Sequence, residues 1–409
     1  MPNQILKKFC GDRPEGWTTE KIGDCLREVS VPIRMRDSES YRLVSIRRRN
    51  GGMFERGHVF GRDILTKTLQ KVIPGSFVIA RMQVVHGACS LASEEFSGAA
   101  ISKSYTSFAG TDRCGTKFFS WLAKSPLMYA YYLHASHGVV IEKMTFDQES
   151  WLRFPIYLPP WREQLGIVEV LEAADESILS KRQLVTKLDR THLALTSHVM
   201  AETTGWRLAK LAELLQGRPK NGYSPKEVED FTGVAMLGLG CLTPTGFEPR
   251  QIKNSPPRDP RVGRARLADG DLLVSRANTR EYVGLAGRYR DIGMPCIYPD
   301  LMMRLTAGPG VRTDFLELAL RSPFARKQIE ALAVGTSESM VKISSDIVMN
   351  LEIKLPALEE QERIVRLVAD AARPLQDTHN QVRKLIAAKQ GLMKDLLTGQ
   401  VRVNSAGKV

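Results

Sequence analysis

Two stretches of the chain carry apolar residues in alternating steps of four and three positions, which is the pattern of the a and d positions of a coiled coil. In the second stretch these positions are Ile364, Val368, Ala371, Leu375, Thr378, Val382, Leu385, Lys389, Leu392 and Leu396. The first stretch has the same seam at Ile167, Leu171, Ala174, Ile178, Lys181, Val185, Leu188, His192, Leu195 and Val199. A 3.5-residue period over about four heptads, present twice, favours two long helices that pair with each other over ordinary packing of each helix on its own domain.

Polar residues interrupt both seams at equivalent positions, Lys181 with Thr378 and His192 with Lys389. Such residues either specify the register of the helix pair or face a partner protein, and the sequence leaves both interpretations open. Pro374 lies inside the second helix, where its missing N–H group predicts a kink near Asp370.

Each long helix follows the same phrase, Leu-Pro-x-x-x-x-Gln, which begins at Leu158 and again at Leu355, 197 positions later. Upstream, Phe118, Ser125-Pro126 and Gly138 recur at this offset. The offset drifts to 195 between Arg81 and Arg276, as expected for loops of different length within a shared fold. The chain is therefore two copies of one module, and a pseudo-twofold axis between them makes the two long helices antiparallel.

The segments that precede the two helices have mixed patterns typical of an α+β module. Short apolar runs at 76–80 and 271–275 predict matching strands after a glycine, and 117–135 and 314–332 predict matching helices. We expect five parts: a first globular domain, a first helix, a second globular domain, a second helix and a flexible tail. Their boundaries are 1–157, 158–203, 204–354, 355–402 and 403–409.

The charge balance points to a polyanionic partner. The chain of 409 residues has 58 Lys and Arg against 45 Asp and Glu, which leaves a net charge of +13. Six scattered cysteines form neither a zinc pattern nor a disulfide framework. No secretory segment and no apolar run of roughly 18 to 20 residues is present, so we expect a cytoplasmic protein without a membrane span.

Cationic and amide side chains in loops are the candidates for contact with a polyanion, since arginine suits both phosphates and guanine edges. In the first module they are Arg47, Arg48, Arg49, Asn50, Arg56 and Arg81. In the second they are Arg218, Lys220, Asn221, Arg276, Asn278, Arg280 and Lys342. A solvated basic loop or a structural ion pair remains the alternative at each position.

Catalytic motifs are not recognisable. The segment Gly110–Lys117 ends in Thr-Lys, the reverse of the order that a phosphate-binding loop requires, and we expect a plain turn. Asp346 and Glu352 resemble part of a nuclease carboxylate cluster, but the equivalent strand of the first copy has no such set. We therefore expect a chain that catalyses nothing and binds no metal or cofactor.

This order of module, Leu-Pro phrase and long helix, present twice, resembles the specificity subunit of type I restriction-modification systems. Gly16-Trp17 and Gly205-Trp206 near the module starts, and the strands that end at Arg81 and Arg276, complete the resemblance. It covers almost the whole chain. Trp161-Arg162, where the second copy has the more typical Leu358-Glu359, is a departure that affects the partner contacts at the first junction.

The resemblance implies that each module is a target-recognition domain for one half of a bipartite sequence in double-stranded DNA. The helices would set the spacer and dock two modification subunits, which restriction and translocase subunits can join. The spacer and docking positions would be Leu158, Pro159, Gln164, Ile167, Leu171, Ile178, Leu355, Pro356, Gln361, Ile364, Val368 and Leu385. S-adenosylmethionine, ATP and Mg²⁺ would belong to the partner subunits.

Two other interpretations stay open at this stage. A self-contained DNA methyltransferase or nuclease should show a methyl-donor loop or metal-binding carboxylates. A coiled-coil adaptor that binds only proteins would not need the excess of positive charge or the Arg47–Arg49 cluster.

Overall fold

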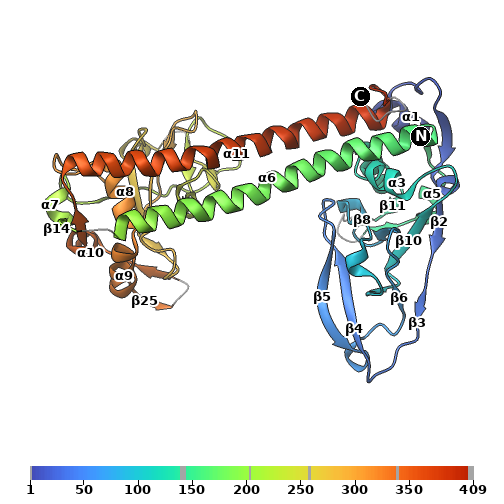
Figure 1. Cartoon of the computed structure of the whole chain (residues 1–409), viewed down its shortest axis with the longest axis horizontal. Helices are drawn as coiled ribbons and strands as arrows, with labels where there is room; N and C mark the ends of the chain where they lie inside the picture. The colour runs from blue at the N-terminus through green and yellow to red at the C-terminus, as the bar shows by residue number, and fades with distance from the viewer. Residues whose placement is uncertain (1, 139–143, 202–203, 257–258, 338–339, 404–409) are drawn as a thin grey trace. The chain divides into compact units, whose positions relative to one another are not determined.

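The computed structural model describes residues 2–138, 144–201, 204–256, 259–337 and 340–403, which form two compact units. The first unit comprises residues 1–182 together with 381–409, and the second comprises residues 183–380. The division falls inside the two long helices, α6 (Trp161–Ala201) and α11 (Leu358–Thr398). Each unit therefore holds one globular domain and half of each long helix (Figure 1).

The first unit is built on a four-stranded sheet of order β2-β10-β7-β8 and a five-stranded sheet of order β3-β6-β9-β4-β5, with the pairs β1-β13 and β11-β12 beside them. Its strands are β1 (Thr18–Lys21), β2 (Leu26–Val29), β3 (Pro32–Ile33), β4 (Ser40–Ile46), β5 (Met53–Phe60), β6 (Leu69–Lys71), β7 (Phe77–Ala80), β8 (Cys89–Leu91), β9 (Ala100–Ser102), β10 (Tyr105–Gly110), β11 (Ser136–His137), β12 (Thr145–Phe146) and β13 (Pro155–Leu158). Its short helices are α1 (Pro2–Cys10), α2 (Ile22–Cys25), α3 (Thr116–Leu122), α4 (Pro126–His134) and α5 (Gln148–Leu152).

The second unit has a matching four-stranded sheet, β15-β24-β20-β22, with the three-stranded sheets β19-β16-β23 and β21-β26-β25 and the pairs β14-β27 and β17-β18. Its strands are β14 (Arg207–Lys210), β15 (Lys220–Asn221), β16 (Ala235–Leu237), β17 (Leu242–Thr243), β18 (Gly246–Phe247), β19 (Ile252–Asn254), β20 (Leu272–Ser275), β21 (Ala277–Asn278), β22 (Ala286–Arg288), β23 (Cys296–Ile297), β24 (Met302–Leu305), β25 (Val334–Ser337), β26 (Met340–Lys342) and β27 (Glu352–Leu355). Its short helices are α7 (Leu211–Leu214), α8 (Thr313–Arg321), α9 (Pro323–Leu332) and α10 (Ser345–Asn350).

The internal repeat extends to the pairing of individual strands. In the first unit Ala80 of β7 lies opposite Tyr105 of β10, and in the second Ser275 of β20 lies opposite Met302 of β24. The strand that leads into each Leu-Pro phrase also pairs alike, β13 with β1 and β27 with β14. The sequence prediction of two copies of one α+β module is confirmed at this level.

The helix predicted at 117–135 is two helices, and so is its counterpart at 314–332. Ser125 caps the second of the first pair by accepting a hydrogen bond from the Met128 N–H at 3.4 Å, and Ser322 accepts one from the Ala325 N–H at 3.3 Å. The proline that follows each serine occupies the first helical turn, where no donor is needed. The prediction of one continuous helix was wrong because Ser-Pro starts a new helix here.

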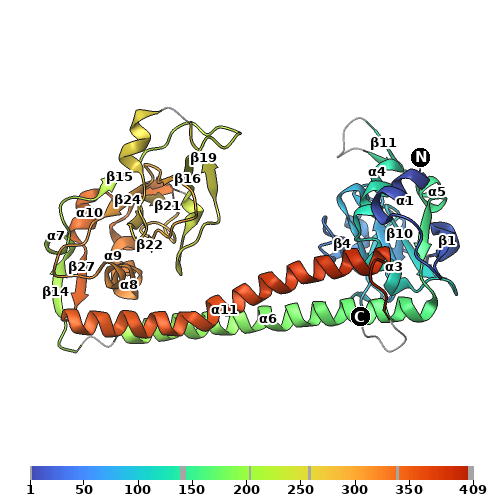
Figure 2. The ribbon, with the colours of Figure 1, turned by 90° about the horizontal axis from the view of Figure 1, so that it is seen from above.

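The long helices pack in opposite directions within both units (Figures 1 and 2). In the first unit Asp175 of α6 forms an ion pair with Lys389 of α11, and Glu163 pairs with Arg402 beyond the end of α11. In the second unit Met200 near the end of α6 shares a core with Ile364 near the start of α11. Pro374 lies inside α11, which continues as a helix on both sides of it.

Both chain ends contribute to the first unit. Leu6 and Cys10 of α1 share a core with Leu396, Leu397 and Val403, and Val403 is buried. The predicted flexible tail therefore does not begin at 403; its remaining residues, 404–409, lie outside the described part of the chain. Within the described ranges, no helix has the length and apolar character needed to cross a membrane.

Candidate nucleic-acid interface

The arginine cluster of the first unit forms the turn between β4 and β5. Arg47, Arg48 and Arg49 are exposed, and the Arg47 guanidinium stacks 4.3 Å from the centre of the Phe54 ring. Arg49 has a φ of 56° and Asn50 a φ of 54°; these left-handed values are costly for arginine, whereas asparagine adopts them more readily. Arg48, Arg49 and the nearby Arg56 form no side-chain hydrogen bond or ion pair with the described residues, so their charge faces solvent.

This turn is fixed to the loop that follows β7. The Arg49 N–H donates to the His86 carbonyl at 2.6 Å, and the Asn50 N–H donates to the Gly87 carbonyl at 2.9 Å. The Asn50 amide donates to the Tyr129 hydroxyl at 3.1 Å and accepts from the Cys89 thiol. The Asn50 amide therefore anchors the turn, and its contact with DNA stays a prediction.

Arg81 and Arg276 occupy equivalent places in the two units. The Arg81 N–H donates to the Ser104 carbonyl at 2.9 Å, and the Arg276 N–H donates to the Leu301 carbonyl at 2.8 Å. Each residue directly follows its strand, β7 or β20, as predicted. Neither guanidinium bonds to another described residue. The same backbone contact therefore holds, in each unit, an arginine whose side chain has no partner among the described residues.

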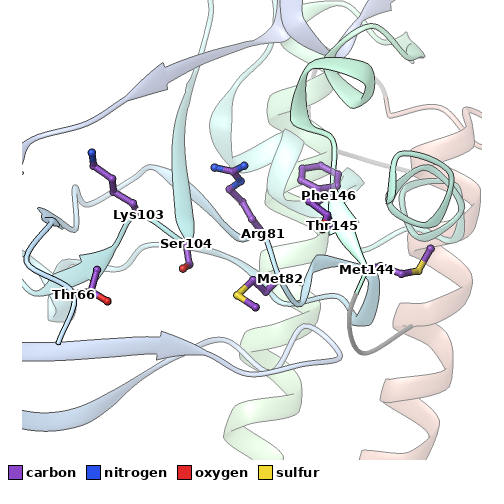
Figure 3. Close-up of a pocket in the computed structure, with 8 residues that line it drawn as sticks. All are labelled: Thr66, Arg81, Met82, Lys103, Ser104, Met144, Thr145 and Phe146. Atoms are coloured by element: carbon purple, nitrogen blue, oxygen red, sulfur yellow. The ribbon is translucent and has the colours of Figure 1, made fainter. Parts of the chain in front are cut away.

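Arg81 lines a hollow of about 340 Å³ on the first unit together with Lys103, Met82 and Thr66. Figure 3 shows the Arg81 guanidinium and the Lys103 ammonium extending to the same side of this hollow. The Met82 side chain is 64% exposed and extends to the opposite side in this view (Figure 3). Two cations that extend to the same side suit contact with the phosphates of a polyanion.

Arg280 of the second unit, another predicted contact residue, has partners within its own domain, and its contact with DNA stays a prediction. Its guanidinium donates to the Glu330 carbonyl at 2.8 Å and to the Ala333 carbonyl, at the end of α9. Carbonyls in the last turn of a helix lack backbone donors, and this arginine supplies them. The Asn278 side-chain oxygen accepts a hydrogen bond from the Thr279 N–H, so part of this amide also has a partner within the domain.

The remaining candidates of the second unit lie on its surface in two groups. Lys342 in β26 lies opposite Ala277, so it is near Arg276. Lys220 and Asn221 are exposed on β15, at the edge of the four-stranded sheet. Arg218 forms an exposed ion pair with Asp346, which reduces the charge that it can offer to a ligand.

The glutamine of each Leu-Pro phrase joins a long helix to its own domain. Gln164 accepts from the Gly115 N–H at 3.0 Å and donates to the Arg113 and Pro159 carbonyls at 2.7 and 3.0 Å. Gln361 accepts from the Arg312 N–H at 2.9 Å and donates to the Gly310 and Pro356 carbonyls at 3.4 and 3.0 Å. Both glutamines are buried, so they act as internal clamps.

Most of the predicted docking positions are likewise internal. Leu385 is half-buried, and the others are buried: Leu158, Pro159, Ile167, Leu171, Ile178, Leu355, Pro356, Ile364 and Val368. These side chains contribute to the packing of the helices and domains, and their role in the docking of partner subunits stays a prediction. Trp161 and Leu358, equivalent residues in the first turn of each long helix, are each 45% exposed.

The polar seam residues are engaged within the chain. Lys389 pairs with Asp175, and its ammonium lies 4.7 Å from the centre of the Trp121 ring. Thr378 donates to the Pro374 carbonyl at 2.7 Å. His192 is buried, and its pKa is lowered by desolvation and by the positive charge of Arg321. These contacts favour a role in register over a role in partner binding.

No cluster of three or more metal-binding side chains occurs among the residues that the structure describes. The Gly110–Lys117 segment runs from the last residue of β10 into the first turn of α3, and a β-carbon at Gly110 would lie 2.2 Å from the Cys114 carbonyl oxygen. Residues 111–115 join β10 to α3 as bends without helix or strand, where the sequence predicted a plain turn.

No family model matches the chain. It is 24% identical to the type I restriction enzyme EcoKI specificity subunit of Escherichia coli K12, an alignment that covers 96% of this chain and 90% of that protein. It is also 24% identical to the MjaVIII specificity subunit of Methanocaldococcus jannaschii over 63% of this chain and 65% of that one.

Solved structures share the fold. A structure described for complex assembly and conformational transition of the type I restriction-modification system has a TM-score of 0.56 at 19% identity and covers 95% of this chain and 100% of that one. The HsdS subunit of Thermoanaerobacter tengcongensis has a TM-score of 0.50 at 18% identity, with 97% of this chain and 100% of that chain covered.

Proposed function

We propose that this chain, which belongs to the specificity subunits of type I restriction-modification enzymes, recognises a bipartite sequence in double-stranded DNA with one half-site for each globular domain. It is the non-catalytic, DNA-recognising subunit of such an enzyme. The observation that carries the bipartite proposal is the repeated presentation of an uncommitted arginine, Arg81 and Arg276, by the same backbone contact in both units.

Affinity for duplex DNA should come largely from phosphate neutralisation. The net charge of +13 and the exposed Arg48, Arg49 and Arg56 support this. Binding that releases condensed counterions gives a steep negative slope of log affinity against log salt concentration. We expect Arg48→Ala with Arg49→Ala to weaken duplex binding and reduce this slope by about two, because each phosphate contact contributes about one.

The salt series separates recognition of DNA from a purely protein-binding adaptor. Fluorescence anisotropy of the whole chain with a labelled duplex, at several salt concentrations, measures the slope. Substitution of the ion-paired Arg36 by alanine is the matched control and should leave the slope unchanged. A flat slope for the unmodified chain would favour the adaptor and reject the proposal.

We further propose that two modification subunits dock on the first turns of α6 and α11, one at Trp161 and one at Leu358. These side chains are large, apolar and equally exposed at equivalent positions of the repeat. S-adenosylmethionine, ATP and Mg²⁺ belong to the modification and restriction subunits in this proposal, and assembly takes place in the cytoplasm.

Native mass spectrometry of the complex tests the docking positions. Trp161→Ala and Leu358→Ala should each lower occupancy to one modification subunit, and the double variant should carry none. Leu184→Ala is the control, since Leu184 is 38% exposed on α6 but is not in a first turn. Two bound modification subunits in the double variant would exclude these positions.

A further inference from the structure

The hairpin loop after β7 and its counterpart after β20 differ in length, although both belong to the four-stranded sheet that the two units share. Ile79 lies opposite Cys89 in the first unit, and Val274 lies opposite Ala286 in the second. The first pair encloses nine residues, 80–88, and the second encloses eleven, 275–285. The change of repeat offset from 195 to 197 therefore falls in this loop, while the strands on both sides keep one register.

Both loops end at a glycine that packs closely against a helix. The helices are α4 in the first unit and its counterpart α9 in the second. Gly87 and Gly284 have φ values of 71° and 72°. A β-carbon at Gly87 would lie 2.0 Å from the Tyr129 hydroxyl, and one at Gly284 would lie 2.4 Å from an Ile329 methyl carbon. A side chain at either position would push the loop off α4 or α9, so the fold holds the loop end at a fixed place.

The loops present different chemistry from this shared position. The first presents Arg81 and the 64% exposed Met82, and the basic turn is hydrogen bonded to it at His86 and Gly87. In the second loop, Arg326 donates to the Glu281 carbonyl at 2.9 Å, and Tyr282 is 39% exposed. One loop thus presents a flexible thioether, and the other an aromatic ring with a hydroxyl.

We infer that segments 81–87 and 276–284 are the elements that distinguish the two half-sites, with Met82 and Tyr282 at base edges and Arg81 and Arg276 beside them. This inference rests on the proposed recognition of bipartite DNA. An exposed thioether suits an apolar contact with a base edge, such as the methyl group of thymine, whereas a phenol can also hydrogen bond. Matching four-stranded sheets that carry loops of unequal length let one fold recognise two different sequences.

A loop exchange in the complete enzyme tests the inference. Residues 81–87 are replaced by the sequence of 276–284, the modification subunits are co-expressed, and methylated adenines are mapped across the host genome. We expect the first half-site of the methylated sequence to change while the second stays as in the unmodified enzyme. An unchanged bipartite sequence, with a melting temperature that shows a folded chain, would overturn the inference.

Point variants keep the test decisive if the exchanged chain does not fold. Met82→Ala should reduce discrimination at one base pair of one half-site by about fivefold, the equivalent of about 1 kcal/mol, and Met82→Leu should retain it. Met294→Ala, at a 38% exposed methionine outside both loops, is the control. Equal discrimination by Met82→Ala and the control would reject the role of Met82. If the unmodified enzyme directs no bipartite methylation, the proposed function itself fails.

Discussion

Single side chains with complete hydrogen-bonding sets hold each long helix to its domain. The Gln361 amide accepts a hydrogen bond from the Arg312 N–H and donates to two backbone carbonyls. The side chain is fully buried, so water cannot supply these bonds instead. A buried polar group that loses such a partner costs more than the bond contributes, because its desolvation is no longer offset. These glutamines therefore determine how firmly the domain and the helix are joined.

Gln361→Ala should destabilise the second unit by about 1–3 kcal/mol, because it leaves the Arg312 N–H without its acceptor. Urea unfolding followed by circular dichroism measures the change in the free energy of unfolding. Gln376→Ala is the matched control, since Gln376 is exposed on the same helix. Equal midpoints for the two variants would show that the clamp contributes nothing.

His192 should make stability depend on pH. Its pKa is lowered in the folded chain, first by desolvation and then by Arg321, so the unfolded chain binds a proton more readily. Stability from the neutral imidazole is fully present above the ordinary histidine pKa of about 6.5 and is lost as pH falls through the lower folded value. His192→Gln should flatten the free energy of unfolding between about pH 5 and 7 relative to the unmodified chain, whereas His379→Gln, at an exposed histidine, should not.

The sequence predicted the place of each candidate side chain better than its partners. The sequence predicted the equivalent places of Arg81 and Arg276 because a glycine, a strand and an arginine recur in the same order. Such a local pattern does not depend on contacts distant in sequence. The sequence did not indicate the partners of Arg280 and Asn50, the end of α9 and Tyr129, because they are 50 or more residues away in sequence. Met82 gave no signal, since only the folded loop shows that its side chain is exposed.

At the scale of elements, the long helices were predictable from their period, and the breaks between the short helices were not. The 3.5-residue seam fixed the pairing of α6 with α11, and a 41-residue helix is about 60 Å long. The sequence prediction missed the two breaks at Ser-Pro, because the apolar periodicity continues across each break although one helix ends and another begins there. The strands of the shared sheets were expected from short apolar runs, but the differing sheets around β4 and β16 depend on contacts distant in sequence.

The long helices should act as a ruler. Insertion of one heptad into each keeps the seam in phase and lengthens the helix pair by about 10 Å, the rise of roughly three base pairs. We expect the spacer between the methylated half-sites to grow by that amount, with both half-sites unchanged. Genome-wide mapping of methylated adenines gives the spacer, and an unchanged spacer would reject the ruler.

At the scale of the whole molecule, the last residues of the chain complete the first unit. Arg402 donates to both carboxylate oxygens of Glu163, at 2.6 and 2.7 Å, and Glu163 also accepts from the Trp17 indole at 3.1 Å. Glu163 is buried, so its charge relies on this partner. Arg402 is therefore the closing contact between the two ends of the chain in this unit.

Arg402→Ala should destabilise the first unit by about 2–4 kcal/mol, because it leaves a buried carboxylate without a counter-ion, although the arginine itself is partly exposed. Thermal unfolding measures the loss. Adding Glu163→Gln should recover part of it, since a neutral amide needs no counter-ion and still accepts from Trp17. A double variant no more stable than Arg402→Ala would show that the loss came from packing.

The return of the C-terminal segment to the first unit also sets an order of events during synthesis. The core that contains Leu6 and Trp17 also contains Leu396, Leu397 and Val403. The second unit is one continuous stretch of chain, 183–380, and can form as soon as that stretch has left the ribosome. The domain that is translated first is thus completed last, and a message truncated within α11 would yield a nascent chain whose N-terminal core stays open to proteases and chaperones.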